Sequence, residues 1–149
     1  MIDSVVVRFA GPPDVAGLVE LKIQWAGRQA QAGESEQLRV ALDEWLRRSD
    51  VVCAVAEDDG QLVGMAWMVV FERVPNLGDV RRHSADVQSV FVIPSHRGRG
   101  VGAELVRSLC EAADRRAVPR VIVHSSSRAV DLYRRAGFTL SPTLLQREV

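Results

Sequence analysis

The chain has 149 residues, of which 47% are hydrophobic, and its 19 basic residues balance its 19 acidic residues. A chain of this length buries about two-thirds of its unfolded surface, and this apolar fraction is typical of folded proteins, so composition argues against disorder. The lack of a basic excess argues against a protein that binds nucleic acid irrespective of its sequence.

The first fifty residues predict one strand and two helices. An apolar run over Val5–Phe9 favours a short strand, which the turn residues at 11–13 close. Asp14 is the expected N-cap of a first helix, and Ser35 of a second. Apolar residues recur at helical spacing in both segments. The apolar positions of the first helix are Val15, Leu18, Leu21 and Trp25, and the expected buried stripe of the second is Leu38, Leu42, Trp45 and Leu46.

The middle of the chain predicts three strands. Apolar runs over 51–56 and 62–71 flank Asp58-Asp59-Gly60, which is a strong β-hairpin signal. A polar, irregular loop is expected over 74–84, followed by a strand over 87–93.

The last third alternates between helix and strand. A helix beginning at Val101 is expected to end before Pro119, because the residue before a proline avoids the helical region. A strand is expected over 120–124, a short helix over 127–136, and further strand structure over 138–147.

Residues 1–149 are expected to form one domain, because the sequence has no repeat, linker or low-complexity stretch. Cys53 and Cys110 are too few and too far apart for a disulfide framework or a metal site. The longest uncharged apolar run is about half the length of a membrane helix, and no secretion signal is visible. These features predict a soluble, cytoplasmic protein that binds no metal and no membrane.

The segment over residues 90–102 is the most informative part of the sequence. An apolar strand stops at Pro94, and three glycines and two arginines follow before an amphipathic helix begins. The free N–H groups of a helix N-terminus attract anions, glycines let a bulky anion approach the backbone, and guanidinium groups bind phosphate oxygens. We therefore expect a phosphorylated ligand here. The residues concerned are Arg97, Gly98, Arg99, Gly100 and Gly102.

Three other interpretations of this segment are weaker. A dinucleotide fingerprint needs Gly-x-Gly-x-x-Gly, and the glycines here are spaced one residue too closely. A P-loop needs Gly-Lys before Ser or Thr, but the only lysine of the chain is Lys22. A turn without a ligand remains open, although the two arginines disfavour it.

The pattern Arg97-x-x-Gly100-x-Gly102, preceded by Val90-x-Val92-x-Pro94, resembles the acyl-CoA signature of the GCN5-related N-acetyltransferases. A second stretch, Ala-Val-Asp-Leu-Tyr-Arg-Arg-Ala-Gly-Phe over 129–138, resembles the Ala-x-x-Leu-Tyr-x-x-x-Gly-Phe segment near the C-terminus of that family. The two motifs occur in the right order. The resemblance covers residues 54–138 well and the first fifty only in outline.

The resemblance implies a mixed α/β fold. Its central, twisted, mostly antiparallel sheet would have six or seven strands with a V-shaped splay, flanked by about four helices. It also implies acetyl-CoA as the donor, with the pantetheine arm along the strand before Pro94 and the pyrophosphate on the glycine loop. An asparagine that many relatives have after the next strand is replaced here by Ser125-Ser126-Ser127. The expected contacts are Val90, Phe91, Val92, Arg97, Gly98, Arg99, Gly100, Val101, Gly102 and Ser126.

The resemblance also suggests catalytic residues. Tyr133 matches the position of the acid that protonates the departing thiolate, although a tyrosine on a helix can equally be a packing residue. Asp86 and Glu72 are the candidates for the base that deprotonates the amine. His124 is a further candidate, whereas His83 and His96 are poorly placed.

The expected function is transfer of an acetyl group to a primary amine of an unidentified acceptor, either a small molecule or a protein N-terminus. No cysteine lies near the motif, so the resemblance predicts direct attack in a ternary complex. Pairing as a homodimer is compatible with the fold. The alternatives are an acyl-CoA-binding module or sensor without turnover and a structural subunit with an empty cleft.

Overall fold

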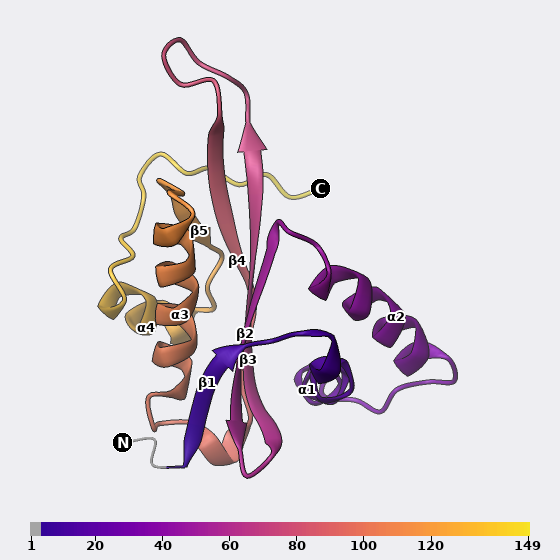
Figure 1. The fold of residues 1–149 in the computed structure, drawn as a ribbon. Helices are drawn as coiled ribbons and strands as arrows, with labels where there is room; N and C mark the ends of the chain where they lie inside the picture. Colours follow the sequence, from indigo (N-terminus) through magenta and orange to yellow (C-terminus); the bar gives the residue numbers. More distant parts are fainter. Residues whose placement is uncertain (1–3) are drawn as a thin grey trace.

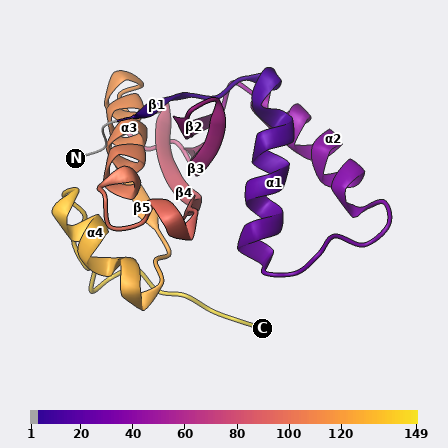
Figure 2. The same ribbon diagram turned by 90° about the horizontal axis from the view of Figure 1, so that it is seen from below.

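The computed structural model describes residues 4–149 and has three layers (Figure 1). A five-stranded sheet separates α1 and α2 from α3 and α4, as the view in Figure 2 also shows. The strands are β1 (Val5–Phe9), β2 (Val51–Asp58), β3 (Gln61–Arg73), β4 (Arg82–Val92) and β5 (Val121–Val123). The α-helices are α1 (Val15–Ala26), α2 (Glu34–Leu46), α3 (Val101–Arg115) and α4 (Val130–Arg135).

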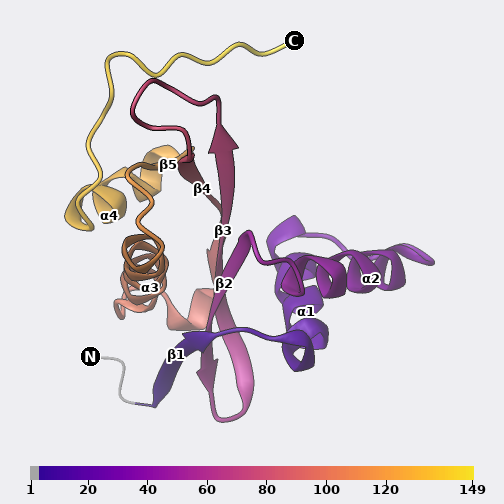
Figure 3. The same ribbon diagram turned by 45° about the horizontal axis from the view of Figure 1, so that its top comes forward.

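The strands lie in the sheet in their order along the chain. The first four are antiparallel neighbours, and β5 runs parallel to β4. The predicted β2–β3 hairpin is confirmed, with positive φ angles at Asp59 (50°) and Gly60 (77°) that fit the tightest hairpin turns. The β3–β4 hairpin extends well beyond the rest of the sheet (Figure 3).

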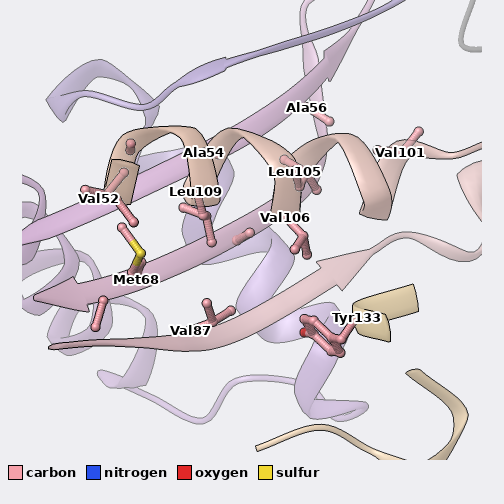
Figure 4. Close-up of a cluster of buried hydrophobic side chains, with 14 of the residues drawn as sticks. Val52, Ala54, Ala56, Met68, Val87, Val101, Leu105, Val106, Leu109 and Tyr133 are labelled. Carbon is pink, nitrogen blue, oxygen red and sulfur yellow. The ribbon is translucent and has the colours of Figure 1, made fainter. Parts of the chain in front are cut away.

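Each face of the sheet carries its own hydrophobic core. Leu105 and Leu109 of α3 are fully buried against the strands (Figure 4). On the other face, Leu18 and Leu21 of α1 pack in a second cluster with Met65 of β3. Truncating one such leucine to alanine typically costs about 2–5 kcal/mol. The helical spacing in the sequence identified these leucines correctly.

A β-bulge interrupts β4 next to β3. Three residues of β3, Met65 to Trp67, lie opposite four residues of β4, Gln88 to Phe91. Ser89 has a left-handed φ of 54°, which is uncommon for a residue with a side chain. Val87 consequently belongs to the α3 core and Phe91 to the α1 core, although they are four residues apart. In an uninterrupted strand, residues four apart would lie on one face.

The fifth strand pairs with β4 only briefly. Ala85, Asp86 and Val87 are paired with Val121 to Val123, and β4 then continues to Val92 without a partner on that side. Pairing stops here because β5 ends at Val123, and this is the point at which the splay is expected. The outer edge of β4 has no strand partner beyond Val87.

The expected number of strands was wrong. Residues 138–147 form no strand, so the described sheet has five strands instead of six or seven. Pro142 lacks an N–H for strand pairing, and the Ser141 hydroxyl accepts hydrogen bonds from the N–H groups of Thr143 and Leu144 in a local turn. The side chains of Leu140 and Leu145 are exposed instead of alternating into a core.

The starts of two elements and one capping contact also differ from expectation. Helix α2 begins at Glu34 with Gly33 at its N-cap, so Ser35 is not the cap. Asp14 is at the N-cap of α1, but its carboxylate instead accepts hydrogen bonds from Arg8 and from the N–H of Gly11. Strand β4 begins at Arg82, because cross-strand pairing with β3 extends into the expected loop.

Among residues 4–149, no helix is long and apolar enough to cross a membrane.

Candidate active site

The glycine loop leads directly into α3. Gly98 and Gly100 have left-handed φ angles of 75° and 83°, which favour glycine, and Gly100 is the N-cap residue. No atom lies within 4 Å of a Cβ placed at either position, so the loop surface is open. Gly102 has a different role, because its Cβ would lie 3.1 Å from Leu132 of α4. The first turn of α3 therefore presents free N–H groups while packing tightly against α4.

The two arginines of the loop differ in their surroundings. The Nε atom of Arg97 donates a hydrogen bond to the Val92 carbonyl at 2.9 Å, and its guanidinium lies 5.6 Å from the centre of the Phe91 ring. Arg97 is thus folded back over the end of β4 and occupies a carbonyl that was expected to face the pantetheine arm. Arg99 is exposed and makes no hydrogen bond through its side chain within residues 4–149. Arg99 is therefore free to meet a phosphate group.

A hydrogen-bonded histidine fixes the turn before the loop. The Nε2 atom of His96 is 2.7 Å from Oδ2 of Asp58, and its Nδ1 atom is 2.8 Å from the hydroxyl of Ser95. Donation by the Ser95 hydroxyl to Nδ1 leaves Nε2 to donate its proton to the carboxylate. The His96 hydrogen bond, and to a lesser degree one from the Ser4 hydroxyl, hold the pKa of Asp58 below its ordinary value. The loop is therefore anchored to the end of β2.

The backbone of β4 provides the second part of the candidate site. Val90, Phe91 and Val92 lie beyond the last residue paired with β5, so their polar groups on that side have no strand partner. The Phe91 side chain points toward α1, where its ring stacks on Trp25 with 6.4 Å between ring centres. Val90 and Val92 pack against the α3 core, as does the buried Val101. The side chains thus hold the strand while its backbone edge remains open.

Tyr133 lies at the end of the α3 core, in the same cluster as Val87 (Figure 4). Its ring meets that of Phe138 edge-on, with 5.5 Å between centres. No residue in 4–149 forms a hydrogen bond with its hydroxyl. Burial raises the pKa of the phenol above its ordinary value, so the group stays protonated at neutral pH. A protonated phenol whose hydroxyl has no partner in the protein suits a proton donor.

The two candidate bases lie on opposite faces of the sheet. Asp86 is paired with Val69, on the face covered by α1 and α2, and its carboxylate accepts a hydrogen bond from Gln88 at 3.0 Å. Glu72 is three residues further along β3 than Val69, so alternation turns its side chain to the other face. It is exposed beside an open depression of about 800 Å³. It lies five residues, or about 17 Å, beyond Trp67 at the bulge.

The serine segment after β5 is only partly used by the protein itself. Ser126 occupies the N-cap position of the short turn before α4, and its carbonyl accepts hydrogen bonds from the Ser125 hydroxyl and from the N–H of Ala129. Within residues 4–149, no hydrogen bond engages the Ser126 hydroxyl. Its position between β5 and α4 leaves it beside the splay. His124 directly follows β5.

Sequence reasoning missed a contact that ties α1 to the bulge. The Nζ atom of Lys22 donates a 2.6 Å hydrogen bond to the Ser89 hydroxyl and lies 4.7 Å from the centre of the Trp25 ring. Burial lowers the pKa of Lys22 below its ordinary value. The only available signal was its helical spacing from Leu18 and Trp25, which places it on the buried face of α1. A cleft of about 220 Å³ opens next to it, between α1 and α2.

Comparison with known proteins identifies relatives of this fold. The model of the Acetyltransferase (GNAT) family matches residues 17–138. Glucosamine 6-phosphate N-acetyltransferase of Trypanosoma brucei brucei is 31% identical over 94 residues, which are 62% of this chain and 62% of that protein. Mycothiol acetyltransferase of Corynebacterium efficiens is 27% identical over 123 residues, 78% of this chain and 37% of that protein. The chain thus spans less than two thirds of these curated relatives.

Solved structures share the whole architecture. A predicted acetyltransferase of Clostridium acetobutylicum, crystallised with acetyl-CoA, superposes with a TM-score of 0.79. The match covers 97% of this chain and 96% of that one, at 18% identity. At this identity the likeness concerns the fold.

Proposed function

The chain belongs to the acetyltransferase (GNAT) family, and from this premise we propose that it transfers an acetyl group from acetyl-CoA to a primary amine. The observation that carries the proposal is that β4 continues without a partner strand after Val87, toward the glycine loop of α3. An open strand edge and an anion-attracting helix N-terminus are the two features that a long amide-containing pyrophosphate ligand requires. In this proposal residues 1–149 form one domain.

The proposed donor site follows from these features. The pyrophosphate would bind the N–H groups at Gly98–Gly102 together with the free guanidinium of Arg99. The pantetheine amides would pair with the backbone edge of Val90–Val92, where the arm would have to displace Arg97 from the Val92 carbonyl. The Ser126 hydroxyl would face the arm from the side of β5. The fit is supported by the open space above Gly98 and Gly100.

The proposed reaction is a direct displacement. The amine nitrogen forms a bond to the thioester carbon, and the carbon–sulfur bond of the resulting tetrahedral intermediate then breaks. The Tyr133 phenol donates its proton to the departing thiolate, and the amine proton passes to Asp86. Asp86 precedes Ser89 by three residues, about 10 Å along the strand, so a water molecule relays this proton. Glu72, on the far face, is the weaker candidate.

Two free cysteines support a reducing compartment, and we extend the proposal to a cytoplasmic enzyme. Neither thiol suits a covalent mechanism. Cys53 is buried, and burial raises its pKa well above the ordinary value. Cys110 belongs to α3, where burial also raises the pKa of its thiol. A nucleophilic thiolate is thus disfavoured at both positions.

The distance of Asp86 from the bulge favours one alternative, a module that binds acyl-CoA without turnover. Both readings are tested by thermal unfolding with acetyl-CoA, coenzyme A or NAD, followed by an assay of coenzyme A release with an amine panel. A ligand at a hundredfold excess over its Kd stabilises the folded state by about 2.7 kcal/mol. Stabilisation by both coenzyme A species but not by NAD, together with amine-dependent release, supports the enzyme. Stabilisation without release on any amine supports the binding module, and no stabilisation refutes both.

A further inference from the structure

The only lysine of the chain carries a charge that no carboxylate balances. Within residues 4–149, no ion pair involves Lys22, whereas Arg8, Arg28 and Arg48 each pair with an acidic side chain. Its ammonium instead contacts two neutral groups, the Ser89 hydroxyl and the Trp25 ring. Half-buried charges are normally paired, because removing them from water is costly. Lys22 therefore makes the α1 face beside the bulge locally positive.

This charge lies beside the strand that the proposed donor site uses. Ser89 is the bulged residue of β4, and the next three residues form the proposed binding site of the pantetheine arm. Lys22 also lines the cleft between α1 and α2, which is open to solvent. The other charges in that cleft, Arg28 and Glu34, neutralise each other through two hydrogen bonds of 2.8 and 2.7 Å. Lys22 is thus the unmatched charge that an incoming molecule would meet.

We propose that the acceptor carries an anionic group, a carboxylate or a phosphate, which the Lys22 ammonium binds beside the β4 bulge. This inference rests on the proposed function and names the class of its acceptor. The anion supplies the counter-charge that the fold omits, and it holds the amine near the thioester. Acceptors with several positive charges and no anion are disfavoured, because like charges repel strongly in a partly buried site.

The first test observes Lys22 directly. Protein labelled with ¹³C at lysine Cε gives one lysine signal, because the chain has one lysine. Saturating coenzyme A keeps added anions away from the glycine loop. Titration with inorganic phosphate or with acetate is expected to shift the lysine signal until it reaches a plateau. Sodium chloride at the same ionic strength is not expected to shift it. Ser89→Ala, which keeps the lysine, is expected to retain the shift. A signal that neither anion moves beyond the chloride control overturns the proposal.

The second test uses matched acceptors. Glucosamine 6-phosphate is compared with glucosamine, and L-alanine with L-alaninamide, and the pair that shows a preference identifies the anion as phosphate or carboxylate. In Lys22→Met the preference for the anionic member is expected to fall by about 10- to 100-fold in kcat/KM, the effect of one charge-assisted hydrogen bond. Lys22→Arg is expected to keep most of it. A preference for the neutral members, or one unchanged in Lys22→Met, refutes the inference.

The two proposals fail in different ways. If the proposed function is wrong, acetyl-CoA does not stabilise the protein against thermal unfolding. If only this inference is wrong, acetyl-CoA binds normally but the anions do not shift the Lys22 signal. If neither acceptor pair reacts, the titration alone decides.

Discussion

The side chain of His96 connects the turn before the glycine loop to Asp58, at the end of β2, through a 2.7 Å contact. The loop that presents the N-terminus of α3 is therefore anchored at one end by a side-chain hydrogen bond and at the other by the packing of Gly102 on Leu132. The His96 anchor lies outside the proposed ligand contacts, whereas Gly102 is one of them, so the His96 anchor can be tested without changing the ligand site.

The Asp58–His96 contact makes stability depend on pH. Because the folded state lowers the pKa of Asp58, its ionised form stabilises the protein above about pH 4, and this contribution disappears as the pH falls through the lowered pKa. Asp58→Asn is therefore expected to lower Tm at pH 7 and to have no effect near pH 2. The check is Tm of the wild type and of Asp58→Asn measured between pH 2 and pH 7, with the neighbouring Asp59→Asn as the control variant. An Asp58→Asn effect that does not change with pH would contradict the assignment.

Gly100→Asp is expected to abolish coenzyme A binding. A carboxylate at this left-handed position would repel the pyrophosphate, and any side chain there costs about 1–2 kcal/mol of backbone strain. Gly78→Asp is the matched control, because Gly78 has a φ of 78° in the distant β3–β4 turn. Both variants are expected to lose similar stability, and calorimetric titration is expected to show binding only in Gly78→Asp. Equal affinity in both would remove the phosphate site.

Tyr133→Phe is expected to lower kcat about 100-fold without weakening acetyl-CoA binding. The change removes the proposed proton donor, and the lost hydroxyl has no hydrogen bond within residues 4–149 whose breakage would destabilise the fold. Phe138→Leu, which alters the ring contact but not the phenol, serves as the packing control. Steady-state kinetics and Tm of both variants separate a loss of proton donation from a loss of packing. Wild-type kcat in Tyr133→Phe would leave Tyr133 with a packing role only.

Asp86→Asn is expected to lower kcat about 100-fold at neutral pH, while Glu72→Gln is expected to leave it within twofold. The difference follows from their opposite faces of the sheet and from the distance of Glu72 from the bulge. The amide oxygen that Asp86→Asn introduces can still accept the hydrogen bond from Gln88, so the fold is preserved. Rates measured across pH with one amine test both variants together. The reverse ranking would reassign the base to Glu72.

The double variant Cys53→Ala with Cys110→Ala is expected to retain acetyl transfer. Direct attack needs no thiol, and burial disfavours the thiolate of both residues. Tm is expected to fall slightly, because the buried Cys53 leaves a small void. A burst of acetylated protein that the double variant lacks would instead indicate a covalent intermediate.

The sequence predicted those features that local chemistry decides. The left-handed Gly98 and Gly100, the hairpin at Asp59-Gly60 and the buried stripes of α1 and α3 each follow from backbone sterics or from periodicity within a few residues. The same reasoning located the glycine loop at the N-terminus of a helix.

The remaining features depend on contacts between distant segments. The strand predicted over 87–93 includes Ser89 as an ordinary strand position. The bulge becomes visible only in the pairing with β3 and in the contact with Lys22, which are both distant in the sequence. The residues after Gly137 look strand-like, but only a partner strand could confirm or reject them. Whether Asp86 and Glu72 share a face depends on cross-strand register, which a single sequence does not contain.

Ser89 has one more consequence, which concerns the length of the chain and not its chemistry. Because Ser89 is the extra residue, Val87 and Phe91 are four positions apart and still face opposite cores. Deleting Ser89 would bring them three positions apart, and regular alternation would then keep each on its present face. A one-codon deletion here is therefore expected to spare both cores and to remove only the bulge, whereas a one-codon deletion or insertion elsewhere in β4 would turn the residues after it to the wrong face.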